Sequence, residues 1–476
     1  MGKDAISQKK AGSSTSPCLH DDDNDNAGAT KKQPVKLRVS IFFDGTANNK
    51  FNNLETKGKL WFYQMVRTSY GNADTNIATL CDCLKADGQA AGGYKFNSKI
   101  YITGVGTATY TAEDGRIAKT INDVSPASDS PAGLALGTGS TGITDTSFNE
   151  NTGEEMLTGG KVKDALDELF RYVTSSVDNN KETIEKLSIN VFGFSRGAAA
   201  ARTFIHYLLD DSKEKMQQRL EGSQYSTSAV EVFFSGIYDT VPSYGMPFMH
   251  KYNTQTLFLT AIAKSVNVVH LTAKDEFREN FSLTNINSKG GKEIALPGAH
   301  ADVGGGYTDN YDETGVVVLQ EGAMVGYESH GGYYNEALMQ NNLRVLYAEK
   351  NRLVDEGWYH ADELRMENAF RLVSTRKNIS NIYRLIPLHI MKKYAKEQGL
   401  LDFGDIDTKF EIPADHPELR QFKEKITEAG TGNYTDDFEL LKKIRHKYFH
   451  TSSDYGSTGM SPNYEGNVKK RHIADG

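Results

Sequence analysis

Cysteine and net positive charge are both scarce in this sequence. Three Cys occur among 476 residues, too few and too irregularly spaced for a disulfide framework or a zinc-ligand pattern. Asp and Glu number 62 against 54 Lys and Arg, which gives a net charge of −8. Because no broad cationic field attracts nucleic acid or anionic lipid, no nucleic-acid partner is predicted.

Long hydrophobic runs are also missing. Crossing a bilayer takes roughly 20 consecutive apolar residues, and stretches such as 256–264 are far shorter. The polar N-terminus has no apolar h-region, so no cleavable secretory signal is predicted. We expect a protein that is made in the cytoplasm, folds under reducing conditions and is not transmembrane.

The composition is that of a folded globular protein. Hydrophobic residues make up 38%, charged residues 24% and aromatic residues 10%, which suffices for a large core. Residues 1–34 differ, because they combine Ser, Gly and Asn with an acidic run at Asp21, Asp22, Asp23 and Asp25. This composition predicts a disordered polar tail. The alternative, a calcium loop, lacks the Gly and the distal Glu of an EF-hand.

Short apolar runs alternate with helix-like stretches over residues 35–325. The predicted strands are 35–43, 97–103, 187–192, 230–238 and 293–296. The predicted helices are 75–84, 162–177 and 198–209. Strands separated by helices are typical of a mainly parallel sheet covered on both faces. We therefore predict the α/β class, with a doubly wound sheet in a catalytic domain.

Two regions do not follow this alternation. Residues 133–160 scatter Gly among Ser, Thr and Asn without a period, which predicts a flexible loop or lid. Past residue 325 the strand signals thin out, and Leu343, Leu346 and Leu353 share one helical face. Residues 326–476 are predicted as a mostly helical C-terminal region, a candidate contact for a membrane or partner, whose status as a separate domain stays open. From residue 452 onward the polar chain is expected to fray.

A G-x-S-x-G pattern lies between a predicted strand and a small-residue helix. It consists of Gly193, Ser195 and Gly197. Alone, a serine in a glycine-rich turn is most often structural. A serine on a sharp strand-to-helix turn, however, takes strained angles and needs neighbours without bulky side chains. The position of the pattern predicts an α/β-hydrolase-like nucleophile elbow with Ser195 as the nucleophile.

A serine hydroxyl needs a base and an orienting carboxylate, in this fold class in the chain order Ser, Asp, His. Asp239 follows the predicted strand 230–238, and His300 lies in a glycine-rich stretch after a short strand. The carboxyl ends of parallel strands meet at one edge of the sheet. We predict His300 as general base and then acid, and Asp239 as the carboxylate that fixes its tautomer.

Alternatives stay open around His300. Asp302 is the rival of Asp239, although its closeness to His300 in sequence favours a role in the local turn. His300 and Asp302 also form a weak metal pattern, since they are one residue apart and lack an H-x-x-x-H partner. No metal and no cofactor is predicted, because a serine triad needs neither. Calcium dependence stays open. The following histidines are expected to be core or surface residues: His206, His250, His270 and His389.

An oxyanion hole needs two donors. The backbone N–H of Arg196, directly after the nucleophile, is the expected first. The predicted strand 35–43 runs into Asp44, Gly45 and Thr46, so this loop is expected to present the N–H of Gly45 or Thr46, with Asp44 in support. The alternative is a plain glycine turn after an edge strand.

Four ordered stretches carry a family resemblance. They are 43–49 (FDGTANN), 193–198 (GFSRGA), 236–241 (GIYDTV) and 297–307 (PGAHADVGGGY). Together they resemble the bacterial α/β-hydrolases that include the first family of type VI secretion lipase effectors. Further similar stretches are 75–77, 104–107, 275–281 and, weakly, 386–391. The family triad would fall on Ser195, Asp239 and His300.

The resemblance implies a phospholipase with A2 activity, and often some A1, that acts on membrane phospholipid. It also implies delivery by a contractile machine into the periplasm of a rival bacterium, with a spike or adaptor protein and an immunity protein as partners. Two other functions stay open. One is hydrolysis of another ester, such as a carbohydrate acetyl group, and the other is a catalytically silent binding component of a secretion apparatus.

Overall fold

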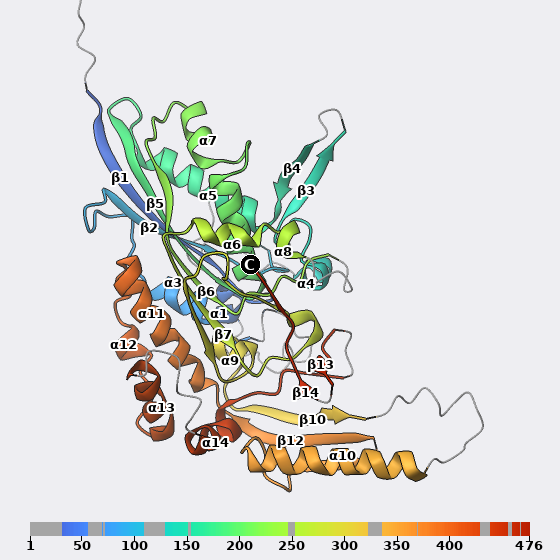
Figure 1. Cartoon of the computed structure of the whole chain (residues 1–476). Coiled ribbons are helices and arrows are strands. Elements are labelled where there is room, and N and C mark those ends of the chain that lie inside the picture. Colours follow the sequence, from blue (N-terminus) through green and yellow to red (C-terminus); the bar gives the residue numbers. More distant parts are fainter. Residues whose placement is uncertain are drawn as a thin grey trace, which may run out of the picture.

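The computed structural model (Figure 1) describes most of the chain. The described residues are 31–55, 69, 72–108, 129–150, 154–245, 253–321, 336–368, 370–428, 438–455, 459–466 and 468–476. Most of the predicted tail, residues 1–30, lies outside this part. The first strand starts at Gln33, two residues before the predicted start at residue 35.

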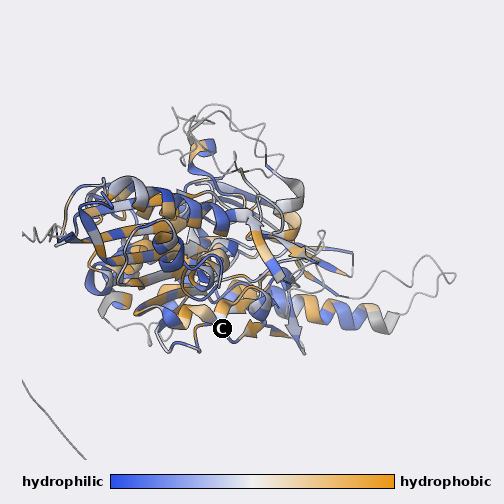
Figure 2. Cartoon of the chain, turned by 90° about the horizontal axis from the view of Figure 1, so that it is seen from above, coloured by the Kyte–Doolittle hydropathy of each residue, from blue (hydrophilic) through white to orange (hydrophobic). Residues whose placement is uncertain are grey.

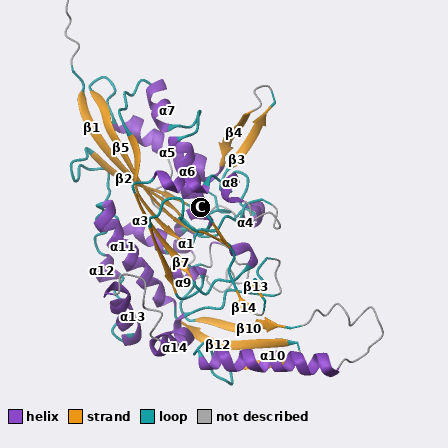
Figure 3. Ribbon diagram, viewed as in Figure 1, coloured by secondary structure: helices purple, strands orange, loops and turns teal. Residues whose placement is uncertain are grey.

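Six strands, all parallel, form the central sheet in the order β2-β1-β5-β6-β7-β9. Figure 3 draws the strands in orange and the helices in purple. Their bounds are β1 (Gln33–Phe43), β2 (Phe96–Ile102), β5 (Glu182–Phe194), β6 (Val230–Tyr238), β7 (Asn267–Ala273) and β9 (Lys292–Leu296). All five predicted strands lie in this sheet. Its remaining strand, β7, is not predicted from the sequence. The chain winds outward from β1 to β2 and then from β5 to β9, so the direction reverses between β1 and β5. Ligands bind at the carboxyl ends of strands beside such a reversal.

Helices cover both faces of this sheet, which confirms the doubly wound architecture. The covering helices are α3 (Asn76–Cys83), α5 (Gly160–Ser176), α6 (Arg196–Leu209) and α11 (Leu385–Gly399). Strand side chains alternate between the two faces. Ile41 and Phe43 belong to the buried cluster under α5 and α6, whereas Phe42 belongs to the cluster under α3 and α11. Most helices accordingly carry both hydrophobic and hydrophilic residues (Figure 2).

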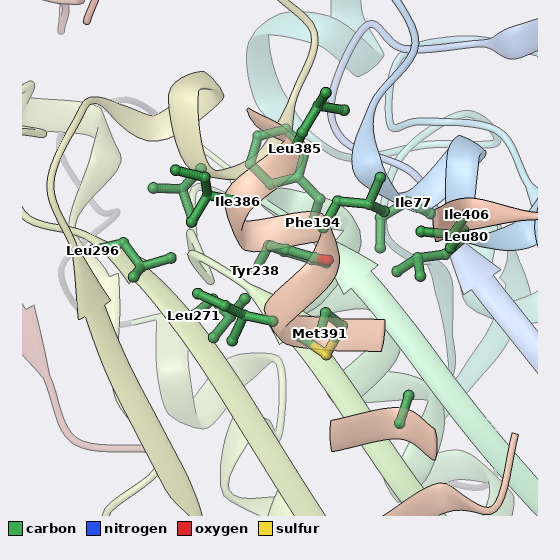
Figure 4. Close-up of a cluster of buried hydrophobic side chains, with 14 of the residues drawn as sticks. Ile77, Leu80, Phe194, Tyr238, Leu271, Leu296, Leu385, Ile386, Met391 and Ile406 are labelled. Carbon is green, nitrogen blue, oxygen red and sulfur yellow. The ribbon is translucent and has the colours of Figure 1, made fainter. Parts of the chain in front are cut away.

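The C-terminal region completes the second helical layer. Leu385, Ile386 and Met391 of α11 lie next to Tyr238 and Leu271 of the sheet (Figure 4). Further helices follow or precede α11: α10 (Glu336–Asp355), α12 (Ile406–Lys409), α13 (Pro417–Glu428) and α14 (Phe438–Tyr448). The region thus shares one core with the catalytic part.

A second, antiparallel sheet has the order β10-β12-β11. Its strands are β10 (Tyr311–Gln320), β11 (Leu364–Glu367) and β12 (Arg371–Ile379), and α10 packs against it. Because β10 precedes residue 325 and β12 follows it, this sheet spans the predicted boundary. The smaller elements of the chain are α1 (Lys50–Glu55), α7 (Met216–Gly222), α8 (Asn253–Thr256), α9 (His300–Gly304), η4 (Leu259–Lys264), η5 (Glu279–Phe281) and η7 (Asn381–Arg384).

The segment 133–160 is not the irregular loop that its composition predicts. It contains most of the short helix α4 (Pro131–Leu136) and a hairpin of β3 (Asp145–Asn149) and β4 (Glu154–Gly159), which projects from the molecule in Figure 1. The polar strand β3 has no apolar alternation, the signal on which strand prediction depends.

The C-terminal tail is the second correction. Instead of fraying, residues 459–463 and 472–476 run along residues 277–288, and a short hairpin of β13 (Tyr464–Glu465) and β14 (Val468–Lys469) lies between them in the described part of the chain. The strand β15 (Ile473–Ala474) pairs in parallel with β8 (Leu283–Thr284). Backbone hydrogen bonds include Asn463 N to Phe277 O at 2.7 Å and Leu283 N to His472 O at 2.9 Å. The partner segment is almost 200 residues away in sequence, which local composition cannot reveal.

In the described part of the chain, no helix combines the length and the apolar character that a bilayer crossing requires.

Candidate active site

Ser195 lies on the turn between β5 and α6 at the carboxyl edge of the sheet. Its backbone angles are φ 60° and ψ −130°, a strained combination for a residue with a side chain. The turn is held by the Ser195 N–H, which donates to the carbonyl oxygen of Tyr238 at 3.0 Å. Strain kept in place by neighbouring hydrogen bonds is typical of a nucleophile elbow.

The two glycines of the pattern are required by close backbone approach. A Cβ on Gly197 would clash with the carbonyl oxygens of Phe43 and Asp44 at the end of β1. A Cβ on Gly193 would stand 2.7 Å from the Cα of Ala198. Glycine at position 197 therefore lets the elbow pack against the end of β1, and glycine at position 193 lets the turn close on the start of α6.

Asp239 and His300 come together from two further loops. Asp239 directly follows β6 and has a positive φ of 41°, and His300 begins α9 just beyond β9. The Nδ1 of His300 lies 2.5 Å from Oδ2 of Asp239, and both side chains are buried. This is the pairing in which a carboxylate fixes the tautomer of a catalytic imidazole.

The His300 ring lies beside the elbow. Its centroid is 4.6 Å from that of Phe194, the residue before Ser195, and Phe281 contacts it edge-on at 5.0 Å. Among the described residues, no hydrogen bond joins the Ser195 hydroxyl to His300. In structures without substrate, such bonds are often long and tighten only in the complex.

Electrostatics keep Asp239 ionised and His300 neutral. Burial raises the pKa of Asp239, but the charge of Arg471 and the contact with His300 outweigh it, so the net pKa falls below its usual range. Burial also lowers the pKa of His300 below 6.5, and the Asp239 carboxylate offsets only part of this effect. A neutral imidazole is the form that can accept a proton from a serine.

The loop after β1 approaches the elbow from the other side. The N–H of Gly45 donates to Oδ1 of Asp44 at 2.7 Å, so this amide is engaged by a carboxylate. Thr46 is linked to the elbow, because its Oγ1 accepts from Nε of Arg196 at 2.8 Å. Of the two predicted oxyanion donors on this loop, the geometry therefore favours Thr46 over Gly45.

Asp44 braces this loop from within the core. Its carboxylate accepts from Oγ1 of Thr75 at 2.6 Å and from Oη of Tyr101 at 2.5 Å. Burial raises its pKa to about 6, although these hydrogen bonds oppose the rise. Three donors thus hold the Asp44 carboxylate in place beneath the loop that it is predicted to support.

Comparison with known proteins identifies the family. A family model described as "T6SS, Phospholipase effector Tle1-like, catalytic domain" matches residues 38–211 and 208–324. The chain belongs to this family. It is accordingly a phospholipase effector of the type VI secretion system, and the four ordered stretches in its sequence all lie within the matched residues.

Two solved structures are similar to this Tle1-like chain. One, titled "Structure of the Tle1 effector bound to the VgrG spike from the Type 6 secretion system", shares 20% identity with a TM-score of 0.60, over 93% of this chain and 94% of that one. The other, an uncharacterized protein from Pseudomonas aeruginosa, shares 18% identity with a TM-score of 0.39, over 87% of this chain and 53% of that one. The first likeness supports the shared fold. No curated protein matches the chain.

Asp302 does not take the place of Asp239 in the Tle1-like site. Its Oδ1 lies 2.6 Å from Nδ1 of His450, and its Oδ2 accepts from the N–H of Ala299 at 2.8 Å. Asp302 therefore stabilises its own turn and pairs with a different histidine. His300 and Asp302 bind separate partners and do not converge on one point. The described residues contain no group of three or more His, Cys, Asp or Glu that could hold a metal ion.

Two other histidines of the Tle1-like chain lie in the core. Nδ1 of His270 is 2.8 Å from Glu293, and Nε2 of His389 is 2.9 Å from the carbonyl oxygen of Phe410. His206 stacks on Phe258, with 3.8 Å between ring centroids. His250 lies outside the described residues.

Three charged residues of the Tle1-like site are not among the site residues that the sequence predicts. Glu276 is buried, pairs with Arg278 at 2.7 Å and lies 3.4 Å from the N–H of His300. Arg471 contacts Asp239 from the C-terminal tail. Glu276 and Arg278 fall in the stretch 275–281 that resembles the family, a signal that could have identified them. Arg471 lies in a segment expected to fray, and no local pattern marks it.

Proposed function

We propose that this chain is a serine esterase that hydrolyses the acyl ester bonds of glycerophospholipids, with A2 activity and A1 activity as a secondary one. The observation that carries the proposal is the buried pair of His300 and Asp239 beside the strained Ser195, in a member of a phospholipase family. The strained backbone of Ser195 argues against a silent module, because packing alone does not require such strain. Membership of a phospholipase family favours a lipid ester over a carbohydrate ester.

In the proposed mechanism, Oγ of Ser195 attacks the ester carbonyl carbon while Nε2 of His300 takes its proton. Asp239 stabilises the imidazolium that forms. Negative charge on the carbonyl oxygen is stabilised by the N–H of Arg196 at the start of α6, whose helix dipole favours anions, and by Thr46.

Collapse of the tetrahedral intermediate breaks the ester bond, and His300 gives its proton to the departing lysophospholipid oxygen. The fatty acyl group stays on Ser195. A water molecule, deprotonated by His300, then releases the fatty acid and regenerates the serine.

The β3–β4 hairpin is the proposed lipid contact within the predicted lid 133–160. Phe148 near its tip is 66% exposed, and Met156 on β4 is 38% exposed. A net acidic protein has to engage a membrane through apolar contact rather than charge. Phe148→Ser should lower activity on vesicles more than on a soluble short-chain ester, and an equal loss on both would refute this role.

Delivery and partners are proposed from the family. The Tle1 effector in the similar structure is bound to the VgrG spike, and that likeness covers the C-terminal region of this chain as well. We propose a spike or adaptor protein as the carrier, an immunity protein in the producing cell, and the periplasm of a target cell as the place of action. Co-purification with a VgrG spike protein would test the first partner.

Product analysis tests the enzymatic proposal. Vesicles of a phospholipid with different acyl chains at the two positions are incubated with the parent and with Ser195→Ala, and products are identified by mass spectrometry. The proposal expects a free fatty acid mainly from the second position, plus lysophospholipid, from the parent only. Release of acetate from acetylated sugars without lipid cleavage would favour the other ester, and equal cleavage by Ser195→Ala would exclude Ser195 as nucleophile.

A further inference from the structure

Arg471 makes a bidentate contact with Asp239. Its Nη1 donates to Oδ1 at 2.6 Å and its Nη2 donates to Oδ2 at 2.9 Å. Two further N–H groups are also used, since Nε donates to the carbonyl oxygen of Phe281 at 2.7 Å and Nη1 to that of Ala273 at 3.3 Å. A planar guanidinium facing a carboxylate in this way fixes orientation as well as charge.

The tail delivers this side chain along a defined path. Residues 459–463 hydrogen-bond to 277–280, and β15 pairs with β8 just beyond Arg471. Ser288 N donates to the carbonyl oxygen of Gly476 at 3.0 Å, which anchors the far side of Arg471. With hydrogen bonds on both sides, Arg471 is held within a backbone frame that begins at the residues next to Glu276 and Arg278.

We propose that Arg471 is a positioning residue of the hydrolase: it holds the Asp239 carboxylate in the orientation that pairs with His300 and sets the basicity of that imidazole. The inference rests on the proposed function, because it gives Arg471 a role in the same site. It also makes the C-terminal tail part of the catalytic apparatus.

The carboxylate of Asp239 is the point on which four donors converge. Besides Arg471 and His300, the N–H of Ala273 donates to Oδ1 at 2.9 Å. Asp239 itself sits on a strained backbone with a φ of 41°. A carboxylate on such a turn stays aimed at His300 only while its three other hydrogen bonds persist, and Arg471 donates two of these three.

The direction of the electrostatic effect follows from the charges around the pair. The imidazole of His300 faces the carboxylates of Asp239 and Glu276 and the guanidinium of Arg278. Asp239 faces Arg471, with His270 and Arg278 further away. Arg471 neutralises the carboxylate and so weakens its pull on a protonated imidazole. Without this cation, the imidazolium is better stabilised and the pKa of His300 rises.

The test compares Arg471→Gln and Arg471→Lys with the parent in kcat/KM against pH on a soluble ester. Arg471→Gln should lower kcat about 10-fold to 100-fold, the loss of charged hydrogen bonds. It should also shift the acidic limb of the pH profile, where activity rises as His300 loses its proton, to higher pH by about half a unit to one unit. Arg471→Lys keeps the positive charge but loses the two parallel hydrogen bonds of the guanidinium. Its kcat should therefore fall, while the acidic limb of its pH profile stays near that of the parent.

Lys470→Gln is the matched control, because it removes the same charge one residue earlier from an exposed pair with Glu465. It should keep the parent kcat and limb. Guanidinium should restore activity to Arg471→Ala, whereas NaCl at the same concentration should not. If Arg471→Gln does not fold, Arg471→Lys and the rescue still decide the question.

Two results would overturn the proposal: an Arg471→Lys variant with parent kcat and KM, or a lower melting temperature in Arg471→Gln with an unchanged acidic limb. Either would reduce Arg471 to an anchor of the tail. An NMR titration of the His300 ring in parent and Arg471→Gln provides a readout independent of turnover. Absence of esterase activity in the parent would refute the proposed function, whereas an unshifted ring titration would refute the inference alone.

Discussion

Two buried histidine–aspartate pairs lie close together in this chain, and only one of them lies at the elbow. The distances are nearly equal: 2.5 Å between His300 and Asp239, and 2.6 Å between His450 and Asp302. The carboxylates differ. Asp239 is held by Arg471, whereas Asp302 accepts from the backbone N–H groups of Ala299 and of His450 itself.

The imidazoles differ more. The ring of His300 lies against Phe194, one residue before the strained Ser195. The ring of His450 stacks on Tyr307 with 3.9 Å between centroids, and within the described residues its buried Nε2 has no hydrogen-bond partner. A short bond between histidine and aspartate is therefore no sign of catalysis by itself, because what lies beyond the second nitrogen decides the role.

Replacing the two histidines gives the sharpest contrast. His300→Gln removes the proposed base and should lower kcat by about a million-fold, as for the base of another serine triad. His450→Gln should keep most of the activity and instead destabilise the fold by about 1 to 3 kcal/mol through a lost buried hydrogen bond. Kinetics and thermal unfolding of both variants would measure this. A comparable activity loss in both would erase the distinction between the pairs.

The aspartates should differ in the same sense, with a smaller effect. Asp239→Asn leaves the imidazole in the wrong tautomer and should cost about 10,000-fold in kcat. Asp302→Asn should act mainly on stability, since Asp302 holds the turn before α9. Steady-state kinetics beside melting curves would separate the two, and a catalytic loss confined to Asp302→Asn would restore Asp302 as the orienting carboxylate.

The pH profile should report only the first pair. Because burial lowers the pKa of His300 below 6.5, and the base works as the neutral form, kcat/KM should rise with pH to a plateau with its midpoint below 6.5. His450→Gln should leave this midpoint in place. A midpoint that moved with His450, or a flat profile over this range, would show that another group limits the reaction.

The smallest expected effect concerns the stacked ring of the second pair. Tyr307→Leu removes the aromatic face over His450 and should lower stability by about 1 kcal/mol with kcat unchanged. Chemical denaturation measures the first quantity and ester hydrolysis the second. A loss of kcat in this variant would link the second pair to turnover.

Much of this site could be predicted from the sequence, for a physical reason. Ser195, Asp239 and His300 each follow a buried strand, and parallel strands bring their carboxyl ends to one edge, so local patterns were enough to place them on one edge. The pairing of His300 with Asp239 rather than Asp302 needed coordinates, because both carboxylates lie on loops at that edge.

What the sequence could not show depends on long-range contacts. Arg471 reaches Asp239 from a polar tail whose strand partner lies near residue 283, and the polar hairpin strand β3 has no hydrophobic alternation. Gly45 was a reasonable oxyanion donor from its position, but its N–H is bonded to the neighbouring Asp44. Such side-chain partners follow from packing, not from local composition.

Labelling with a fluorophosphonate tests whether Ser195 is a nucleophile activated by His300, because only a serine activated by its own base reacts rapidly with this probe. We expect one adduct, which mass spectrometry maps to Ser195. It should be absent in Ser195→Ala and in His300→Gln and present in His450→Gln. An adduct on another serine, or equal labelling of the parent and His300→Gln, would contradict this expectation.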